Sequence, residues 1–197
     1  SNFRREYISW LNENKPDNFD KVYILDLDVS DHADLIDRKN FIIIDHHSTH
    51  ARVKDVYKNA ECHVVETTSC AKLIYKTLPL QLTNARKMLI ALADDYDCYA
   101  LKLKESYQLN CLLTNLQKPA GKQRADAYMQ KFYEGFRPFN TQESNIIKSH
   151  IKRRDDTIDN LQIFSGNVPI SGKERKVFGT SGNKFVNEVC EHIINTH

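Results

Sequence analysis

The apolar run at residues 41–44, Phe-Ile-Ile-Ile, is the feature that most constrains the fold of this chain. A continuous apolar run of this length is typical of a strand that is buried on both faces of a parallel sheet. The run ends abruptly at Asp45, His46 and His47. Titratable groups at the carboxyl end of such a strand lie where open α/β sheets bind their ligands. A strand that merely ends in polar turn residues is the alternative, and the consecutive Asp-His-His disfavours it.

A second apolar run, at residues 21–25, ends in Asp26 and is followed by Asp28. Between the two runs, residues 30–37 predict a short capped helix. A right-handed strand–helix–strand connection would make the two strands parallel, with Asp26 and Asp45 at the same edge of the sheet. Adjacent strands lie about 4.8 Å apart, so the two carboxylates would be close enough to share a metal ion. Asp28 is an additional candidate at this strand end.

A third group of acids, Asp94, Asp95 and Asp97, follows a predicted helix over residues 84–93 with Thr83 as its N-cap. Carboxylates near a helix C-terminus face the negative end of the macrodipole, which costs about 0.3–1 kcal/mol each. A divalent cation nearby would offset that cost. A solvated acidic helix end is the alternative, and the two other clusters disfavour it.

Taken in order and spacing, these elements resemble the DHH phosphoesterase family, which is named for the Asp-His-His tripeptide. Residues 67–75 are similar to the family's Ser/Thr-initiated helix after the histidines. Residues 94–97, together with Leu109-Asn110, resemble a variant found in phage and bacterial members. The resemblance covers residues 20–117 and implies an α/β domain with a mostly parallel sheet flanked by helices.

Members of the family are two-metal phosphohydrolases, usually with manganese, that act on oligonucleotides, cyclic dinucleotides or pyrophosphate. The resemblance therefore implies hydrolysis of phosphodiester bonds in short oligonucleotides or nucleotides, with two Mn²⁺ or Mg²⁺ ions in the complete site. Mixed carboxylate and imidazole ligands suit these ions, whereas thiolates would favour zinc. The five cysteines are scattered and form no Cys-x-x-Cys pair.

The resemblance also implies roles for individual residues. Asp26 would bridge both metals, and His46 and Asp95 would be metal ligands. Asp95 is preferred to Asp94 and Asp97 because Tyr99 falls where the family often has an aromatic residue; the other two acids and Asp28 remain additional candidates. Asp45 and His47 are the expected catalytic residues, with Asp45 supporting the site and His47 facing the substrate phosphate. His50 and Arg52 are candidate contacts to that phosphate, although isolated surface residues explain them equally well.

Two departures from the family pattern bear on activity. The family's first motif, a His and two Asp residues after an N-terminal strand, has no match here, since the chain opens on an amphipathic helix. We expect a truncation upstream. The alternative is a catalytically degenerate DHH-like scaffold or binding module in a nucleic-acid-processing complex. The family's C-terminal Gly-Gly-Gly-His-like stretch is absent as well.

The rest of the chain predicts a helical connector and the start of a second domain. Helices are expected over residues 121–136 and 141–160, with a break at residues 137–140. The basic segment at residues 148–154 could steer a nucleic-acid phosphate toward the site, but acids follow it directly and a solvated helix face is the preferred interpretation. The expected domains are a DHH domain at 1–117, partial at its N-terminus, a connector at 118–160, and the beginning of a smaller C-terminal α/β substrate-binding domain at 161–197.

Near the C-terminus, residues 179–182 (Gly-Thr-Ser-Gly) precede a predicted helix from Asn183 to about Asn195. The amides of that helix N-terminus could hold a phosphate. A plain turn followed by an N-cap is the commoner explanation.

Composition narrows the function further. The formal net charge of +2 provides no strong electrostatic case for binding a long duplex, and a short oligonucleotide or nucleotide fits better. No apolar stretch approaches the roughly 20 residues of a membrane span, and no signal peptide is visible. Unpaired cysteines suit a reducing compartment, so a cytoplasmic location is expected. The oligomeric state is open, with a homodimer as one option.

Overall fold

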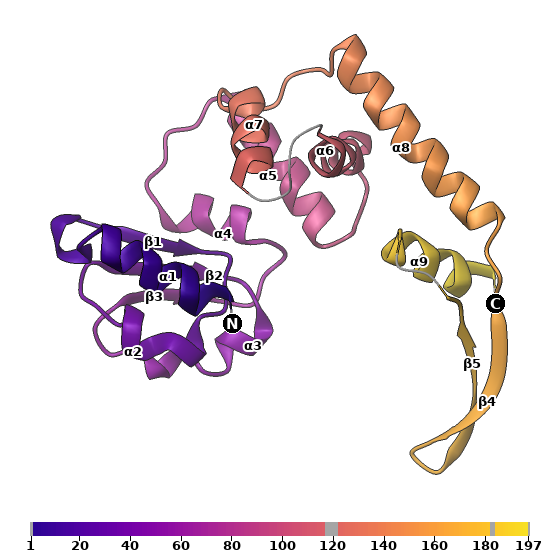
Figure 1. Cartoon of the computed structure of the whole chain (residues 1–197), viewed down its shortest axis with the longest axis horizontal. Helices are drawn as coiled ribbons and strands as arrows, with labels where there is room; N and C mark the ends of the chain where they lie inside the picture. The colour runs from indigo at the N-terminus through magenta and orange to yellow at the C-terminus, as the bar shows by residue number, and fades with distance from the viewer. Residues whose placement is uncertain (1, 117–121, 182–183, 197) are drawn as a thin grey trace. The chain divides into compact units, whose positions relative to one another are not determined.

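A computed structural model describes residues 2–116, 122–181 and 184–196 of the chain (Figure 1). Contacts group the chain into two compact units, residues 1–107 with 132–137, and residues 108–131 with 138–197. Each unit is described by itself. The predicted boundary between residues 117 and 118 lies outside the described residues, and the division into three domains stays a prediction.

The first unit holds a three-stranded sheet in the order β1-β2-β3, with both pairs of strands parallel. The expected strands and their parallel pairing are confirmed, whereas the third strand was not predicted. Its elements are α1 (Asn2–Glu13), β1 (Val22–Leu25), α2 (Ala33–Ile36), β2 (Phe41–Asp45), α3 (Ser48–Ala51), β3 (Glu61–Val64), α4 (Cys70–Thr77) and α5 (Asn84–Asp97), with short 3-10 turns at Pro16–Asn18, Ser30–His32 and Lys54–Val56.

Strand β2 is the centre of the core, because every one of its residues is buried. Phe41 and Ile43 face a cluster that includes Tyr7 of α1 and Ile36 of α2. Ile42 and Ile44 face the other side of the sheet and pack against Cys70 and Leu73 of α4. Helices therefore cover both faces of the sheet, as a continuous apolar strand requires.

The two helices that follow the sheet begin at hydroxyl caps. The Ser69 side chain accepts a hydrogen bond from the Lys72 amide at the start of α4. Thr83 accepts one from the Arg86 amide at the start of α5, which confirms the predicted N-cap. Helix α5 continues to Asp97, so the acidic cluster lies in its last turns instead of after its end.

Helices α6 (Lys104–Asn115) and α7 (Lys122–Phe132) connect the two units in sequence. The second unit continues with α8 (Thr141–Asp159), which begins at a capping box in which Asn140 and Glu143 satisfy each other's backbone amides. The predicted break before this helix is confirmed. Strands β4 (Phe164–Ile170) and β5 (Lys173–Gly179) form an exposed antiparallel hairpin that was not predicted.

Helix α9 (Val186–Thr196) begins later than the predicted start at Asn183. Of residues 179–182, for which phosphate binding was considered, residue 182 lies outside the described residues. In the portion of the chain that the structure describes, no helix has the length and apolar character needed to cross a membrane.

Candidate metal centre

Asp26 is the first residue of the candidate site and lies directly after β1. Its amide still donates to the carbonyl of Ile44, as the next step of the parallel ladder. Its backbone, however, has a φ of 58°, in the left-handed region that only a few per cent of non-glycine residues adopt. The turn in the backbone removes the Asp26 side chain from the alternation of the strand.

His46 lies at the corresponding end of β2 and is largely buried. Its Nε2 atom lies 3.3 Å from Oδ1 of Asp26 and 3.4 Å from Oδ2 of Asp97. Its Nδ1 atom lies 3.2 Å from the carbonyl oxygen of Thr67, and a carbonyl only accepts hydrogen bonds. Nδ1 therefore carries the hydrogen, and Nε2 faces two carboxylates. Such an arrangement needs a cation, a proton or a metal ion, between the three atoms.

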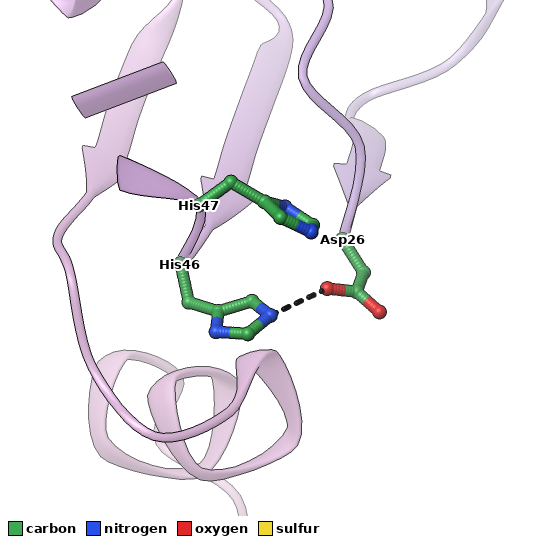
Figure 2. A group of neighbouring side chains, drawn as sticks. All are labelled: Asp26, His46 and His47. Carbon is green, nitrogen blue, oxygen red and sulfur yellow. Dashed lines mark ion pairs between the residues drawn. The ribbon is translucent and has the colours of Figure 1, made fainter. Parts of the chain in front are cut away.

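His47, the residue after His46, completes the cluster. Asp26, His46 and His47 each offer a ligand atom within 4.8 Å of the other two. Figure 2 shows the Asp26 carboxylate facing the His46 ring, with the His47 ring beside them. Nδ1 of His47 donates to Oδ1 of Asp45 at 2.7 Å, which leaves Nε2 for a ligand or a substrate. The hydrogen bond to Asp45 and the charges of Asp45, Asp26 and Asp97 raise the pKa of His47 above its usual value.

Asp97 supplies the second carboxylate, from the last residue of α5. Partial burial and the negative charge of Asp26 raise the pKa of Asp97, although His46 opposes the shift. A carboxylate whose pKa is raised by a neighbouring acid in this way is common where a cation binds.

The donor set fits a divalent cation. Donors bound to one ion at about 2.0–2.2 Å lie about 2.8–3.6 Å apart for the usual coordination angles. The two separations at His46 fall in this range. The Thr67 carbonyl is the outer partner that fixes the tautomer of a ligating histidine. Asp26 and His46 could therefore hold a metal ion, with Asp97 and His47 as further donors.

The carboxylate of Asp45 is committed to other partners and is not available to share a metal ion with Asp26, which differs from our expectation. Its side chain is fully buried, on the same face of β2 as Phe41 and Ile43. Oδ1 accepts hydrogen bonds from the His46 amide and from the His47 ring, and Oδ2 accepts one from His50. Burial alone would raise the pKa of Asp45, but these bonds outweigh it and hold the pKa low. Asp45 supports the site from behind.

Asp95, the preferred third ligand, points elsewhere. Its carboxylate accepts hydrogen bonds from the Lys102 and Leu103 amides and from the Ser106 hydroxyl at the start of α6. These bonds lower the pKa of Asp95 in spite of its desolvation. The side chain is committed to capping the next helix, and Asp97 is the acid of this cluster that reaches His46.

The remaining additional candidates are also engaged in local structure. Asp94 accepts hydrogen bonds from Thr68, Ser69 and Lys72 and so ties α5 to the start of α4. Asp28 accepts from Ser30 and Thr49 and joins the end of β1 to α3.

The two candidates for contact with a phosphate behave differently from each other. His50 has no exposed surface and bonds to Asp45 and Tyr57, so it cannot reach a substrate. Arg52 is exposed just after α3, so its side chain is accessible to a substrate. The roles of Thr67, which contacts His46, and of Tyr57, which contacts His50, were not predicted. The Ser/Thr-rich segment before α4 was a sequence signal for Thr67, and Tyr57 had none.

Comparisons with protein-family models, with curated proteins and with solved structures give no match for this chain. The resemblance to DHH phosphoesterases therefore depends on the motifs alone.

Proposed function

We propose that this chain is a divalent-metal-dependent phosphohydrolase of the DHH type, acting on short oligonucleotides or nucleotides. One observation carries the proposal. Carboxylate oxygens of Asp26 and Asp97 lie 3.3 Å and 3.4 Å from the Nε2 atom of His46, an imidazole with a fixed tautomer, at the carboxyl edge of a parallel sheet.

The proposed ligands differ from those expected from the sequence in one position. Asp26, His46 and Asp97 would hold one ion, because the carboxylate of Asp95 is occupied by the start of α6. Mn²⁺ or Mg²⁺ suits this mixture of oxygen and imidazole donors. When bound, such an ion lowers the pKa of a water ligand and neutralises charge on phosphoryl oxygens. A second ion would need donors beyond these three.

His47 has the role of the residue that faces the phosphate. It is half exposed, and Nδ1 is held by buried Asp45, so Nε2 is the nitrogen presented to a substrate. A positioned imidazole of this kind can donate a hydrogen bond to a phosphoryl oxygen or transfer a proton. Exposed Arg52 would add a positive charge nearby in sequence.

Metal binding tests the first half of the proposal. We expect isothermal titration calorimetry to detect Mn²⁺ binding by the native chain, with Kd raised at least about tenfold in Asp26→Asn, His46→Gln and Asp97→Asn, because even outer-shell changes cost about that much. Asp31→Asn and His63→Gln are matched controls, since Asp31 is exposed and His63 pairs with Glu61 on β3. Native-like binding by all three variants would refute the centre.

Hydrolysis tests the second half. We expect the native chain with Mn²⁺ to cleave a dinucleotide and bis(p-nitrophenyl) phosphate, and the three ligand variants to lose this activity while both controls retain it. A chain that binds Mn²⁺ but turns over neither substrate would instead be a catalytically degenerate binding module.

A further inference from the structure

Behind the candidate metal centre, four side chains form a continuous chain of hydrogen bonds. The Tyr57 hydroxyl lies 2.8 Å from Nε2 of His50. Nδ1 of His50 lies 2.8 Å from Oδ2 of Asp45, and Oδ1 of Asp45 lies 2.7 Å from Nδ1 of His47. Asp45 and His50 are fully buried, and Tyr57 is nearly so. We call these four residues the His47 relay.

The direction of each hydrogen bond follows from the Tyr57 end. Within the described ranges, the Tyr57 hydroxyl has His50 as its one hydrogen-bond partner. A buried hydroxyl that keeps its hydrogen must donate it to that partner, so Nε2 of His50 is an acceptor. A neutral His50 then carries its hydrogen on Nδ1 and donates it to Oδ2 of Asp45.

The same accounting continues to His47. Asp45 is a carboxylate that only accepts, and its second oxygen already receives the amide of His46. Nδ1 of His47 therefore donates to this oxygen and keeps its hydrogen. Only Nε2 of His47 is left to face the cluster of Asp26 and His46.

We propose that Tyr57 and His50 are positioning residues for His47: through Asp45 they fix the orientation and tautomer of its ring, so that Nε2 alone meets the phosphate. This inference rests on the proposed function. His50 is fully buried, and a buried histidine destabilises the fold unless both of its ring nitrogens are hydrogen-bonded. An apolar side chain would fill the same space without that requirement. The hydrogen bonds of the His47 relay explain why residue 50 is a histidine and not an apolar residue.

Two substitutions separate positioning from packing. Tyr57→Phe removes only the hydroxyl, and Tyr23→Phe, at an exposed tyrosine of β1, is the matched control. We expect Tyr57→Phe to lower kcat about tenfold, the size of an outer-shell effect, with KM and the Kd for Mn²⁺ little changed. His50→Gln keeps one donor and one acceptor and should retain more activity than His50→Leu.

Nuclear magnetic resonance supplies a readout that does not need activity. We expect the ring ¹⁵N shifts of His47 to report a single Nδ1–H tautomer in the native chain and in Tyr23→Phe, and a mixture in Tyr57→Phe. An unchanged tautomer in folded Tyr57→Phe would overturn the relay while leaving the proposed hydrolase intact. If the native chain hydrolyses nothing, the hydrolase proposal fails, and the ¹⁵N shifts still decide on the relay.

Discussion

Nε2 of His46 and Oδ1 of Asp26 lie 3.3 Å apart because Asp26 leaves the strand conformation one residue after β1 ends. Leu25 pairs with Ile44, so an extended Asp26 would stand opposite Asp45 and share its face of the sheet. The positive φ of Asp26 turns its carboxylate away from Asp45 and toward His46. Strain of this kind is commonly concentrated at functional sites.

Substitutions at Asp26 test this backbone conformation. The left-handed region costs a residue with a Cβ atom about 1–2 kcal/mol, and glycine avoids that cost. We expect Asp26→Gly to have a higher free energy of unfolding than Asp26→Ala by about 1 kcal/mol in metal-free urea titrations. Both variants should lose Mn²⁺ affinity. Equal stability of the two would mean that residue 26 is not left-handed in solution.

Asp95 and Asp97 are predicted to have opposite effects when each is changed to asparagine. Asp95→Asn removes the charged acceptor from the start of α6, so we expect a lower Tm with Mn²⁺ affinity retained. Asp97→Asn removes a ligand, so affinity should fall. Differential scanning calorimetry and calorimetric titration of the two variants measure both quantities. Loss of affinity in Asp95→Asn alone would restore Asp95 as the ligand.

Without metal, Asp97→Asn is predicted to change the free energy of unfolding in a way that depends on pH. Because the pKa of Asp97 is raised in the folded chain, its carboxylate is a net cost once the pH rises through that pKa, and no cost at lower pH. We expect Asp97→Asn to be at least as stable as the native chain at about pH 7 without metal. Urea titration at this pH and at about pH 3.5 checks the difference, which should vanish at the lower pH.

Much of the first unit could be predicted because its signals are local. The apolar runs at residues 22–25 and 41–44 specify strands, and Thr83 specifies a helix start. β3 was missed because its sequence, Glu-Cys-His-Val, has only one residue that favours a buried strand. Its place is set by pairing with β2, which is a non-local interaction.

The candidate site could be predicted only in part, and the physical reason is different for each residue. The position of Asp26 and His46 follows from the topology of parallel strands. Which of Asp95 and Asp97 reaches His46 depends on the side of α5 from which each side chain projects and on the loop amides that bind Asp95. A sequence motif contains neither piece of information. The burial of His50 likewise depends on Tyr57, which belongs to no pattern in the sequence.

Asp37 is predicted to make stability depend on pH. Its carboxylate accepts hydrogen bonds from the backbone amides of Lys58, Asn59 and Ala60, just before β3. Partial burial alone would raise the pKa of Asp37, but these bonds outweigh it and lower the pKa. The stabilisation is thus present above the unfolded pKa of about 3.9 and is lost as the pH falls through the lower folded value.

We therefore expect Asp37→Asn to lower the free energy of unfolding by about 1–2 kcal/mol at about pH 6, because an amide oxygen replaces two charged acceptor atoms. The gap between the variant and the native chain should shrink as the pH approaches the folded pKa. Urea titrations across this range measure it. A gap that stays constant down to the lowest pH would show that the charge of Asp37 is not what the loop amides require.

Gly135 is predicted to be the least replaceable glycine of those described. Its φ is 107°, and a Cβ atom there would lie 2.3 Å from the carbonyl carbon of Ala85 and 2.4 Å from the amide nitrogen of Arg86. The next residue, Phe136, donates its amide to the Ala85 carbonyl at 2.9 Å. The close approach therefore holds this segment against the first turn of α5, and neither backbone can move without breaking the contact.

We expect Gly135→Ala to lower the free energy of unfolding by about 2–4 kcal/mol, since strain from the backbone and overpacking against a rigid neighbour add. Gly166→Ala is the matched control, because a Cβ atom at Gly166 of β4 meets nothing within 4 Å. Asp97 lies at the far end of α5, about 18 Å from Ala85 by helical rise. The folded fraction of Gly135→Ala should therefore bind Mn²⁺ with native affinity. Weaker binding in that fraction would mean that the position of α5 as a whole, and with it the reach of Asp97 to His46, depends on this glycine contact.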